Sequence, residues 1–252
     1  MNTRSHLQKT IGNFLKERNY PGLQVRAMLF DMDGVLFDSM KNHTLAWFRT
    51  IQALGIDCTR EEFYLYEGCT GAATINLLFQ RAWGREATPE EIERIYAEKS
   101  RHFNELPEAL PMPGTKELLQ KVMERGIRPV LVTGSGQRSL LERLERVYPG
   151  VFGSEYMVTA FDVEKGKPHP EPYLKGLEKA GVKPAEAIVV ENAPMGVKSG
   201  VAAGIFTIAV NTGPIPEKDL WNAGANLLYP SVQALTDRFD EIQNNIAAIE
   251  SL

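Results

Sequence analysis

The chain of 252 residues is long enough for one domain or two, and we expect two of unequal size. Its 43% apolar and 24% charged residues are typical of a globular protein, and the formal net charge of −4 argues against a general nucleic-acid or membrane surface. The two cysteines have neither metal-ligand nor disulfide spacing, so we expect packing residues in a reducing cytoplasm. A monomer is the default expectation.

Residues 1–25 predict an N-terminal helical extension. Apolar residues recur there at helical spacing, namely Leu7, Ile11, Phe14 and Leu15. The segment has no continuous apolar stretch of signal-peptide or membrane-spanning length. We expect a short amphipathic helix that docks on its own domain, with a surface for a partner as the alternative.

From residue 26 the sequence alternates between strands and helices. A short apolar run at 26–30 predicts a buried strand, and the alternation resumes with a helix at 114–126 and a β-branched strand at 127–134. It continues with helices at 137–148, 171–182 and 195–204 and strands at 156–160, 187–192 and 205–212. Strands and helices at this spacing imply right-handed crossovers and a parallel sheet covered on both faces.

Residues 41–110 have a different composition, rich in helix formers and poor in β-branched runs. They predict an all-helical cap, inserted after the first strand and placed above its carboxyl end, where open α/β sheets bind ligands. The predicted fold is therefore α/β. Its Rossmann-like, parallel-sheet catalytic core comprises 26–40 and 111–252, and its small helical cap domain comprises 41–110.

Two aspartates follow the first predicted strand, in the sequence LFDMDGV. Asp31 and Asp33 are separated by one residue, and Gly34 helps to form the turn, so their groups converge on one small volume. Their mutual repulsion requires a cation. Mg²⁺ suits carboxylate and carbonyl oxygens and leaves positions open for water and a phosphate. For this motif alone, solvated turn aspartates are the more common interpretation.

Two later strand ends carry groups that suit a phosphate. Thr133, followed by Gly134 and Ser135, supplies a hydroxyl and small residues whose amides can approach phosphate oxygens. Lys167 precedes a predicted helix, where its ammonium can offset the charge of a phosphoryl group. An ordinary turn and a solvated lysine are the alternatives for each one alone.

A further apolar strand ends in Glu191 and Asn192. The ordered set of DxDG, Thr/Ser, Lys and this acidic corner closely resembles the haloacid dehalogenase-like hydrolase superfamily of phosphotransferases. The resemblance covers residues 26 to about 229. Within the superfamily, the sequence is most similar to the β-phosphoglucomutase-like subfamily.

The resemblance implies that Asp31 attacks phosphorus, forming an aspartyl phosphate, and that Asp33 is the general acid and base. It also implies a Mg²⁺ ion held by Asp31, by the backbone carbonyl of Asp33 and by the corner formed by Glu191 and Asn192. The commonest form of the motif has a second acidic residue where Asn192 stands. A neutral amide oxygen is expected to bind the metal less strongly.

Three cap residues match positions used in the β-phosphoglucomutase-like subfamily. His43 and Trp47 lie four residues apart on the first predicted cap helix, and Lys99 falls on the last one. We expect His43 to orient Asp33. The purely structural alternatives are a hydrogen-bonded cap histidine, a core tryptophan and a solvated lysine.

The cap loop YEGCTGAAT, residues 66–74, bears on the substrate. The mutase pattern has a lysine and an arginine where this chain has Glu67 and Gly71, and the arginine holds the far phosphate of a sugar bisphosphate. A glutamate there repels a bare anion but tolerates magnesium pyrophosphate. The loop resembles that of a branch of inorganic pyrophosphatases, and we expect Glu67 to determine substrate specificity.

The sequence thus predicts a Mg²⁺-dependent phosphohydrolase whose substrate is inorganic pyrophosphate or another small phosphorylated compound. One alternative is a β-phosphoglucomutase or a sugar-phosphate phosphatase. Another is a non-catalytic module that binds phosphorylated metabolites. Against the last stands the presence of Asp31, Asp33, Thr133 and Lys167 together.

Overall fold

Six parallel strands form one sheet in the order β3-β2-β1-β4-β5-β6 in this computed structural model, which describes residues 3–136 and 138–250. The strands are β1 (Ala27–Phe30), β2 (Arg128–Val132), β3 (Met157–Val158), β4 (Ala187–Glu191), β5 (Phe206–Val210) and β6 (Leu227–Tyr229). The predicted parallel α/β fold is confirmed. The central position of β1 and β4 places the ends of both strands in the middle of one sheet edge.

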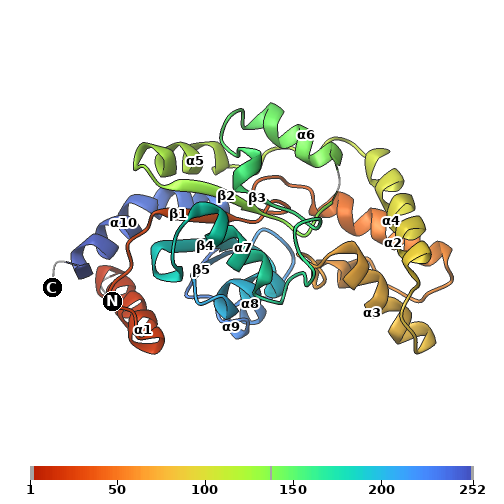
Figure 1. Cartoon of the computed structure of the whole chain (residues 1–252), viewed down its shortest axis with the longest axis horizontal. Coiled ribbons are helices and arrows are strands. Elements are labelled where there is room, and N and C mark those ends of the chain that lie inside the picture. The colour runs from red at the N-terminus through yellow and green to blue at the C-terminus, as the bar shows by residue number, and fades with distance from the viewer. Residues whose placement is uncertain (1–2, 137, 251–252) are drawn as a thin grey trace.

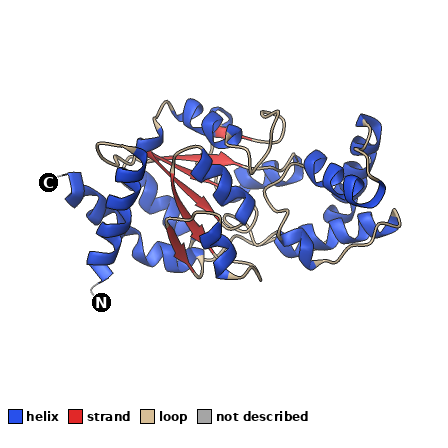
Figure 2. Ribbon diagram, turned by 90° about the horizontal axis from the view of Figure 1, so that it is seen from below, coloured by secondary structure: helices blue, strands red, loops and turns tan. Residues whose placement is uncertain are grey.

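Helices cover both faces of the sheet (Figures 1 and 2). They are α1 (Thr3–Arg18), α5 (Thr115–Glu124), α6 (Arg138–Val147), α7 (Glu171–Ala180), α8 (Pro194–Ala202), α9 (Glu217–Asn222) and α10 (Val232–Glu250). Along β1, Met28 and Phe30 pack with α5, α6 and α10, whereas Leu29 packs with α7 on the other face. This alternation explains why the strand is apolar at every position.

The N-terminal helix α1 docks on the core, beside α10 (Figure 1). Ile11 and Phe14 are buried, and the Phe14 ring meets the edge of Phe206 at 5.2 Å between centroids. The amphipathic face of α1 is therefore covered by its own domain. No helix in the described residues is long and apolar enough to cross a membrane.

The strand expected at 156–160 is shorter in the structure. Only Met157 and Val158 pair with β2, because Thr159 turns the chain by donating from its amide and its hydroxyl to Asp162 at 2.8 Å. The helix expected at 137–148 is described from Arg138 onward as α6, and Gln137 lies outside the described residues.

Three α-helices and a short 3-10 helix form a cap at one end of the molecule (Figure 1). They are α2 (Met40–Ala53), η1 (Glu61–Tyr64), α3 (Gly71–Trp83) and α4 (Pro89–Asn104). Trp47, Phe63 and Phe79 belong to a hydrophobic cluster separate from that of the sheet. The cap therefore has a small core of its own, and it meets the carboxyl ends of the strands.

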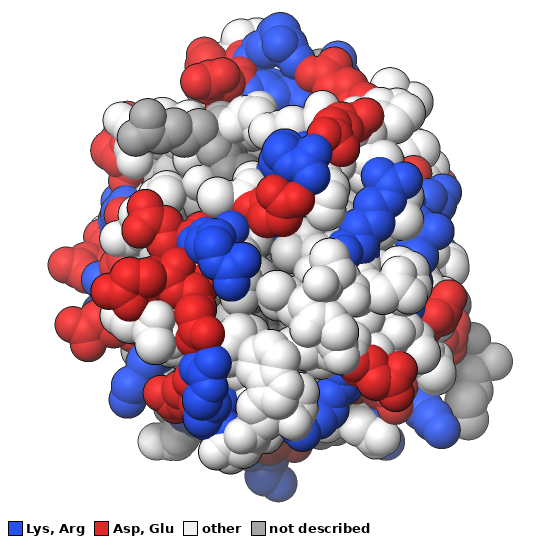
Figure 3. All heavy atoms as spheres, turned by 90° about the vertical axis from the view of Figure 1, so that its right-hand side faces the viewer, with Lys and Arg blue, Asp and Glu red and all other residues white. Residues whose placement is uncertain are grey.

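The outer face of the cap carries acidic and basic side chains interspersed with one another (Figure 3). On α4, Arg101 pairs with Glu98 at 2.5 Å and also with Glu105. Such exposed pairs contribute little to stability. The charges that bear on chemistry are those buried between the cap and the core.

Candidate active site

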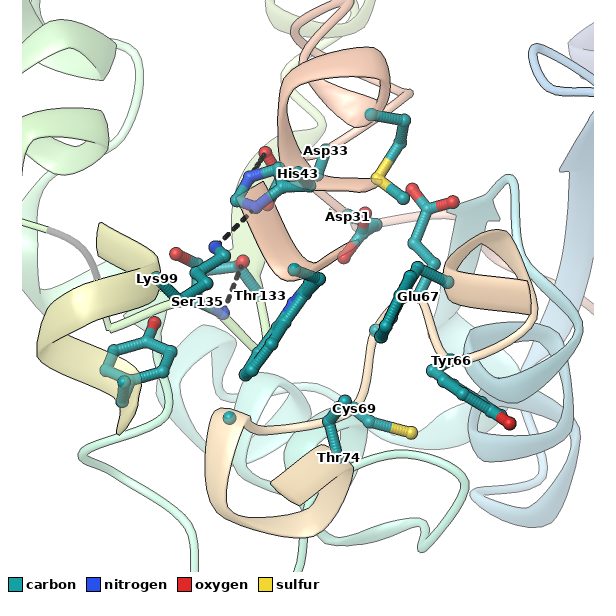
Figure 4. A pocket seen from close by; sticks show the side chains of 17 residues that line it. Asp31, Asp33, His43, Tyr66, Glu67, Cys69, Thr74, Lys99, Thr133 and Ser135 are labelled. Carbon is teal, nitrogen blue, oxygen red and sulfur yellow. Dashed lines mark hydrogen bonds and ion pairs between the residues drawn. The ribbon is translucent and has the colours of Figure 1, made fainter. Parts of the chain in front are cut away.

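A cavity of about 50 Å³ lies between the cap and the carboxyl ends of β1 and β2. The core supplies Asp31, Asp33 and Thr133 to its lining, and the cap supplies His43, Glu67 and Lys99. Figure 4 shows these side chains converging from opposite sides. The structure thus brings together most of the residues that the sequence singles out.

Lys167 lies directly beneath Asp31. Its Nζ atom is 2.6 Å from Asp31 Oδ1 and 2.6 Å from Glu191 Oε1, and it also donates to the carbonyl of Val132 at 2.9 Å. Burial raises the pKa of Asp31 to about 8, although Lys167 opposes this shift. Burial favours a neutral Lys167, but the two carboxylates outweigh it and raise the pKa of Lys167. Lys167 therefore remains an ammonium ion.

The carboxylate of Glu191 accepts four hydrogen bonds. Lys167 and the hydroxyl of Tyr173 donate to Oε1 at 2.6 and 2.9 Å. The backbone amides of Asn192 and Ala193 donate to Oε2 at 3.0 and 3.3 Å. A carboxylate has about four lone-pair positions, so direct metal ligation by Glu191 requires one of these bonds to break. In this arrangement Glu191 anchors Lys167.

A hydrogen-bonded chain joins Asp33 to the cap (Figure 4). Asp33 Oδ1 accepts from Ser39 Oγ at 2.6 Å and lies 3.1 Å from His43 Nε2, and Lys99 Nζ lies 2.7 Å from His43 Nδ1. A charged Lys99 donates to Nδ1, so the ring proton resides on Nε2 and is donated to Asp33. The expected contact between His43 and Asp33 is therefore present.

The same chain shifts the proton affinities of its members. Burial raises the pKa of Asp33, but the electrostatic interaction with His43 and the hydrogen bonds from His43 and Ser39 outweigh burial, and the net pKa is lowered. Burial lowers the pKa of Lys99 to about 7, against the attraction of Asp33. Burial, followed by repulsion from Lys99, lowers the pKa of His43. The arrangement favours an ionised Asp33.

The segment after β2 turns toward the cap loop. Ser135 donates its backbone amide to Thr133 Oγ1 at 3.0 Å, which fixes the turn through Gly134. A Cβ atom at Gly134 would lie 2.4 Å from the carbonyl oxygen of Gly68. Gly134 therefore permits the backbone of the cap loop to approach the core.

Glu67 enters the site from the cap loop and is only 6% exposed. Its Oε1 accepts from Asn192 Nδ2 at 2.7 Å. Burial, reinforced by the charge of Asp31, raises the pKa of Glu67 well above its usual range. The cap thus contributes an acidic group to the corner that β4 forms in the core.

This corner fits a hard cation. Glu67 Oε2 and Asn192 Oδ1 are buried and have no hydrogen-bond partner among the described residues. Buried oxygens without donors are costly, and carboxylate and amide oxygens are preferred ligands of Mg²⁺. Within 3–136 and 138–250, no three acidic, histidine or cysteine residues form a ready cluster. A cation held at this corner would draw on amide and backbone oxygens as well as on carboxylates.

Ser39 and Tyr173 are site residues that sequence reasoning missed. Ser39 is the N-cap residue of α2, yet its hydroxyl donates to Asp33 instead of capping the helix. Tyr173 is fully buried beneath Glu191. The only sequence signal for Tyr173 is a tyrosine on the apolar face of a helix soon after Lys167. Cys69 also lines the cavity, and burial raises its thiol pKa to about 11.

The fold and the site define an α/β protein with a helical cap over paired aspartates at the carboxyl end of a parallel sheet. Residues 28–210 match the sequence profile of the haloacid dehalogenase-like hydrolases, and the chain belongs to this family. The family resemblance seen in the strand-end motifs is confirmed.

Three known proteins illustrate the range of relatives. A phosphorylated carbohydrates phosphatase from Thermotoga maritima is 32% identical over 206 residues, which cover 80% of this chain and 92% of that one. A provisionally named pyrophosphatase from Caldanaerobacter subterraneus is 27% identical over 195 residues, which cover 77% of this chain and 85% of that one. A solved structure from Bacteroides vulgatus, provisionally named a beta-phosphoglucomutase, is 49% identical with a TM-score of 0.93, covering 96% and 99%.

Proposed function

We propose that this protein is a Mg²⁺-dependent phosphohydrolase that cleaves inorganic pyrophosphate through an aspartyl-phosphate intermediate, with other compact phosphate esters as secondary substrates. The choice of substrate rests on one observation: Glu67 accepts a hydrogen bond from the Asn192 side chain beside Asp31. In its carboxylate form, Glu67 disfavours a bare anionic sugar phosphate. It favours a substrate that brings its own divalent cation.

In the first step, a carboxylate oxygen of Asp31 attacks phosphorus, and the bond from phosphorus to the leaving oxygen breaks. Lys167 holds Asp31 at 2.6 Å and offsets part of the negative charge. Asp31, Asn192 and the backbone carbonyl of Asp33 would hold Mg²⁺, which when bound would offset negative charge on the phosphoryl oxygens. Thr133, Gly134 and Ser135 line the same cavity, and the Thr133 hydroxyl suits those oxygens.

Asp33 acts as the general acid in the first step and as the general base in the second. In its acid form it gives a proton to the leaving oxygen, and its carboxylate then takes a proton from the water that attacks the aspartyl phosphate. That attack frees phosphate and restores Asp31. Ser39 and His43 lower the pKa of Asp33 and so favour the carboxylate form. A leaving phosphate needs less protonation than a sugar alkoxide does, which supports pyrophosphate as the substrate.

The test is phosphate release in the presence of Mg²⁺ from pyrophosphate and a panel of sugar phosphates. Wild type, Glu67→Ala and the exposed cap control Glu93→Ala are compared. We expect wild type and the control to prefer pyrophosphate and Glu67→Ala to lose that preference. Faster hydrolysis of hexose phosphates, unchanged by Glu67→Ala, would contradict the proposal and favour a sugar phosphatase, as in the Thermotoga relative.

A mutase is the weaker alternative. A mutase must hold the second phosphate of its bisphosphate intermediate, which requires a cation on the cap loop. This chain has Glu67 and Gly71 at the two positions concerned. The ring of Tyr96, on α4, also fills the space beside Gly71, because a Cβ atom there would lie 2.3 Å from its Cδ2 atom.

A further inference from the structure

The loop after β5 reaches the turn that carries the two aspartates. Thr212, two residues beyond the end of β5, donates its hydroxyl to the backbone carbonyl of Gly34 at 2.7 Å. Gly34 follows Asp33 directly and has a φ of +84°. Its amide is held as well, because it donates to the carbonyl of Phe37 at 2.7 Å. Hydrogen bonds therefore fix the backbone on both sides of Gly34.

Gly34 is the point of this turn that most needs such bonds. Glycine has no Cβ atom to restrict φ and ψ, so its conformation has to be fixed from outside. A side chain is excluded there, because a Cβ atom would lie 2.0 Å from Asn192 Nδ2 and 3.0 Å from Glu67 Oε1. A rotation of the backbone at Gly34 would move Asp33, the residue before it. Thr212 opposes that rotation from the carbonyl side.

The loop that carries Thr212 is itself held in place. The backbone amide of Asn211 donates to the carbonyl of Tyr229 at 2.8 Å. The side-chain amide of Asn211 donates to the carbonyl of Ile215 at 2.9 Å, which closes the loop on itself. Ile215 is buried in a hydrophobic cluster of the core. The Thr212 hydroxyl is thus presented to Gly34 from a fixed frame.

The cap covers the same loop. Tyr64, the last residue of η1, packs against the hydrophobic cluster that contains Ile215. A Cβ atom at Gly213 would lie 3.5 Å from Cδ1 of the Tyr64 ring, which is ordinary van der Waals contact. Gly213 is the neighbour of Thr212 in the chain. The cap therefore packs on the loop directly beside the residue that holds Gly34.

We propose that Thr212 is a positioning residue, which sets the place of Asp33 for proton transfer by holding the carbonyl of Gly34. This inference rests on the proposed role of Asp33 as general acid and base, and it is independent of the choice of pyrophosphate as substrate. Among the described residues, those that line the cavity do not include Thr212. It therefore acts through the turn, and loss of its hydroxyl slows the chemical step without weakening substrate binding.

The test compares kcat and KM for pyrophosphate in wild type, Thr212→Val and Thr212→Ser. Valine has no hydroxyl, and we expect kcat to fall about tenfold while KM stays within about threefold of wild type. Serine keeps the hydroxyl, and its kcat should stay within about threefold of wild type. Thr207→Val is the matched control on β5, because it removes a buried hydroxyl that donates to a backbone carbonyl, that of Ile205, at 3.0 Å.

Acetyl phosphate separates the loss of positioning from a general loss of activity. Its acetate leaves without needing a proton, so a misplaced Asp33 costs less with this substrate. In Thr212→Val, we expect the fall in kcat/KM to be at least about threefold smaller for acetyl phosphate than for pyrophosphate. Thr212→Ala, which also lacks the hydroxyl, replaces Thr212→Val if that variant does not fold.

An unchanged kcat in the folded hydroxyl-free variant would overturn the inference. So would an equal fall for both substrates, a fall in kcat as large in Thr207→Val, or no rescue by Thr212→Ser. A wild type that hydrolyses glucose 6-phosphate faster than pyrophosphate, with kcat for glucose 6-phosphate lowered as predicted in Thr212→Val and acetyl phosphate spared, would support the role of Thr212. The same result would contradict pyrophosphate as the substrate.

Discussion

Lys167 bridges Asp31 and Glu191, with its Nζ atom 2.6 Å from a carboxylate oxygen of each. The two acids end neighbouring strands in the middle of the sheet, and all three side chains are almost completely buried. Without the ammonium, two buried negative charges would face one another. The bridge therefore explains how two buried carboxylates are kept at this point, and it gives Lys167 a structural role beside the catalytic one that we propose for it.

Replacing Lys167 with Met is expected to abolish turnover and to lower the free energy of unfolding by about 3 kcal/mol at pH 9.5, because buried carboxylates lose their counter-ion. Burial already raises the pKa of Asp31 to about 8, and removing Lys167 raises it further. Asp31 is therefore neutral in both proteins at pH 6, where the loss is smaller, and the loss grows above pH 8, where wild type keeps the Asp31 carboxylate beside Lys167. Urea unfolding at both pH values measures this.

Lys165→Met is the matched control for that experiment, because Lys165 is exposed and lies two residues away. It should unfold like wild type at both pH values. An equal loss of stability at pH 6 and pH 9.5 in Lys167→Met would show that packing, and not charge, accounts for the effect.

The buried Lys99 gives a second pH dependence. Burial lowers its pKa from 10.5 to about 7, so between these values the unfolded chain binds more protons than the folded chain. Stability relative to Lys99→Met should rise with pH across this window by about 1.4 kcal/mol per pH unit. This gain in stability relative to Lys99→Met is lost as the pH falls toward 7.

Chemical unfolding of wild type and Lys99→Met at pH 7 and pH 9 measures this difference. Lys116→Met, at an exposed position on α5, should run parallel to wild type. A constant difference between wild type and Lys99→Met over the window would mean that Lys99 keeps an ordinary pKa in the folded protein.

The fold was largely predictable because its signals are local. The apolar run of β1 and the aspartates after it mark a buried strand and its end, and neighbouring parallel strands bring Asp31 and Glu191 together. The end of β3 was less predictable. The turn there depends on the Asp162 side chain, which competes with strand pairing for the Thr159 amide.

The contacts across the cap and core interface were not predictable from local pattern. Ser39 has the position of an ordinary helix cap, and only the folded structure shows its hydroxyl directed to Asp33. In the sequence, Gly71 stands where the mutase pattern has an arginine. In the structure it is the space that Tyr96 fills, a relation between two helices distant in sequence.

Replacing Asn192 with Asp tests the cation corner without relying on activity. The amide that donates to Glu67 becomes a second carboxylate, so the metal-free variant should unfold at a lower temperature than wild type. Mg²⁺ binds the folded state, and it should raise the melting temperature of the variant more than that of wild type. Thermal unfolding with and without Mg²⁺ measures both shifts.

Asn222→Asp, at an exposed position on α9, is the control and should respond to Mg²⁺ like wild type. If Asn192→Asp gains no more from Mg²⁺ than this control does, the corner beside Glu67 is not the cation site.

The most direct measurement for the whole account is rapid acid quenching of the enzyme during turnover of ³²P-labelled pyrophosphate with Mg²⁺. Borohydride reduction and peptide mass spectrometry then locate any acyl phosphate. We predict label on the protein, conversion of residue 31 to homoserine, and neither label nor turnover in folded Asp31→Asn. Sustained phosphate release by Asp31→Asn, with no labelled protein in wild type, would contradict the central role given to the Asp31 carboxylate.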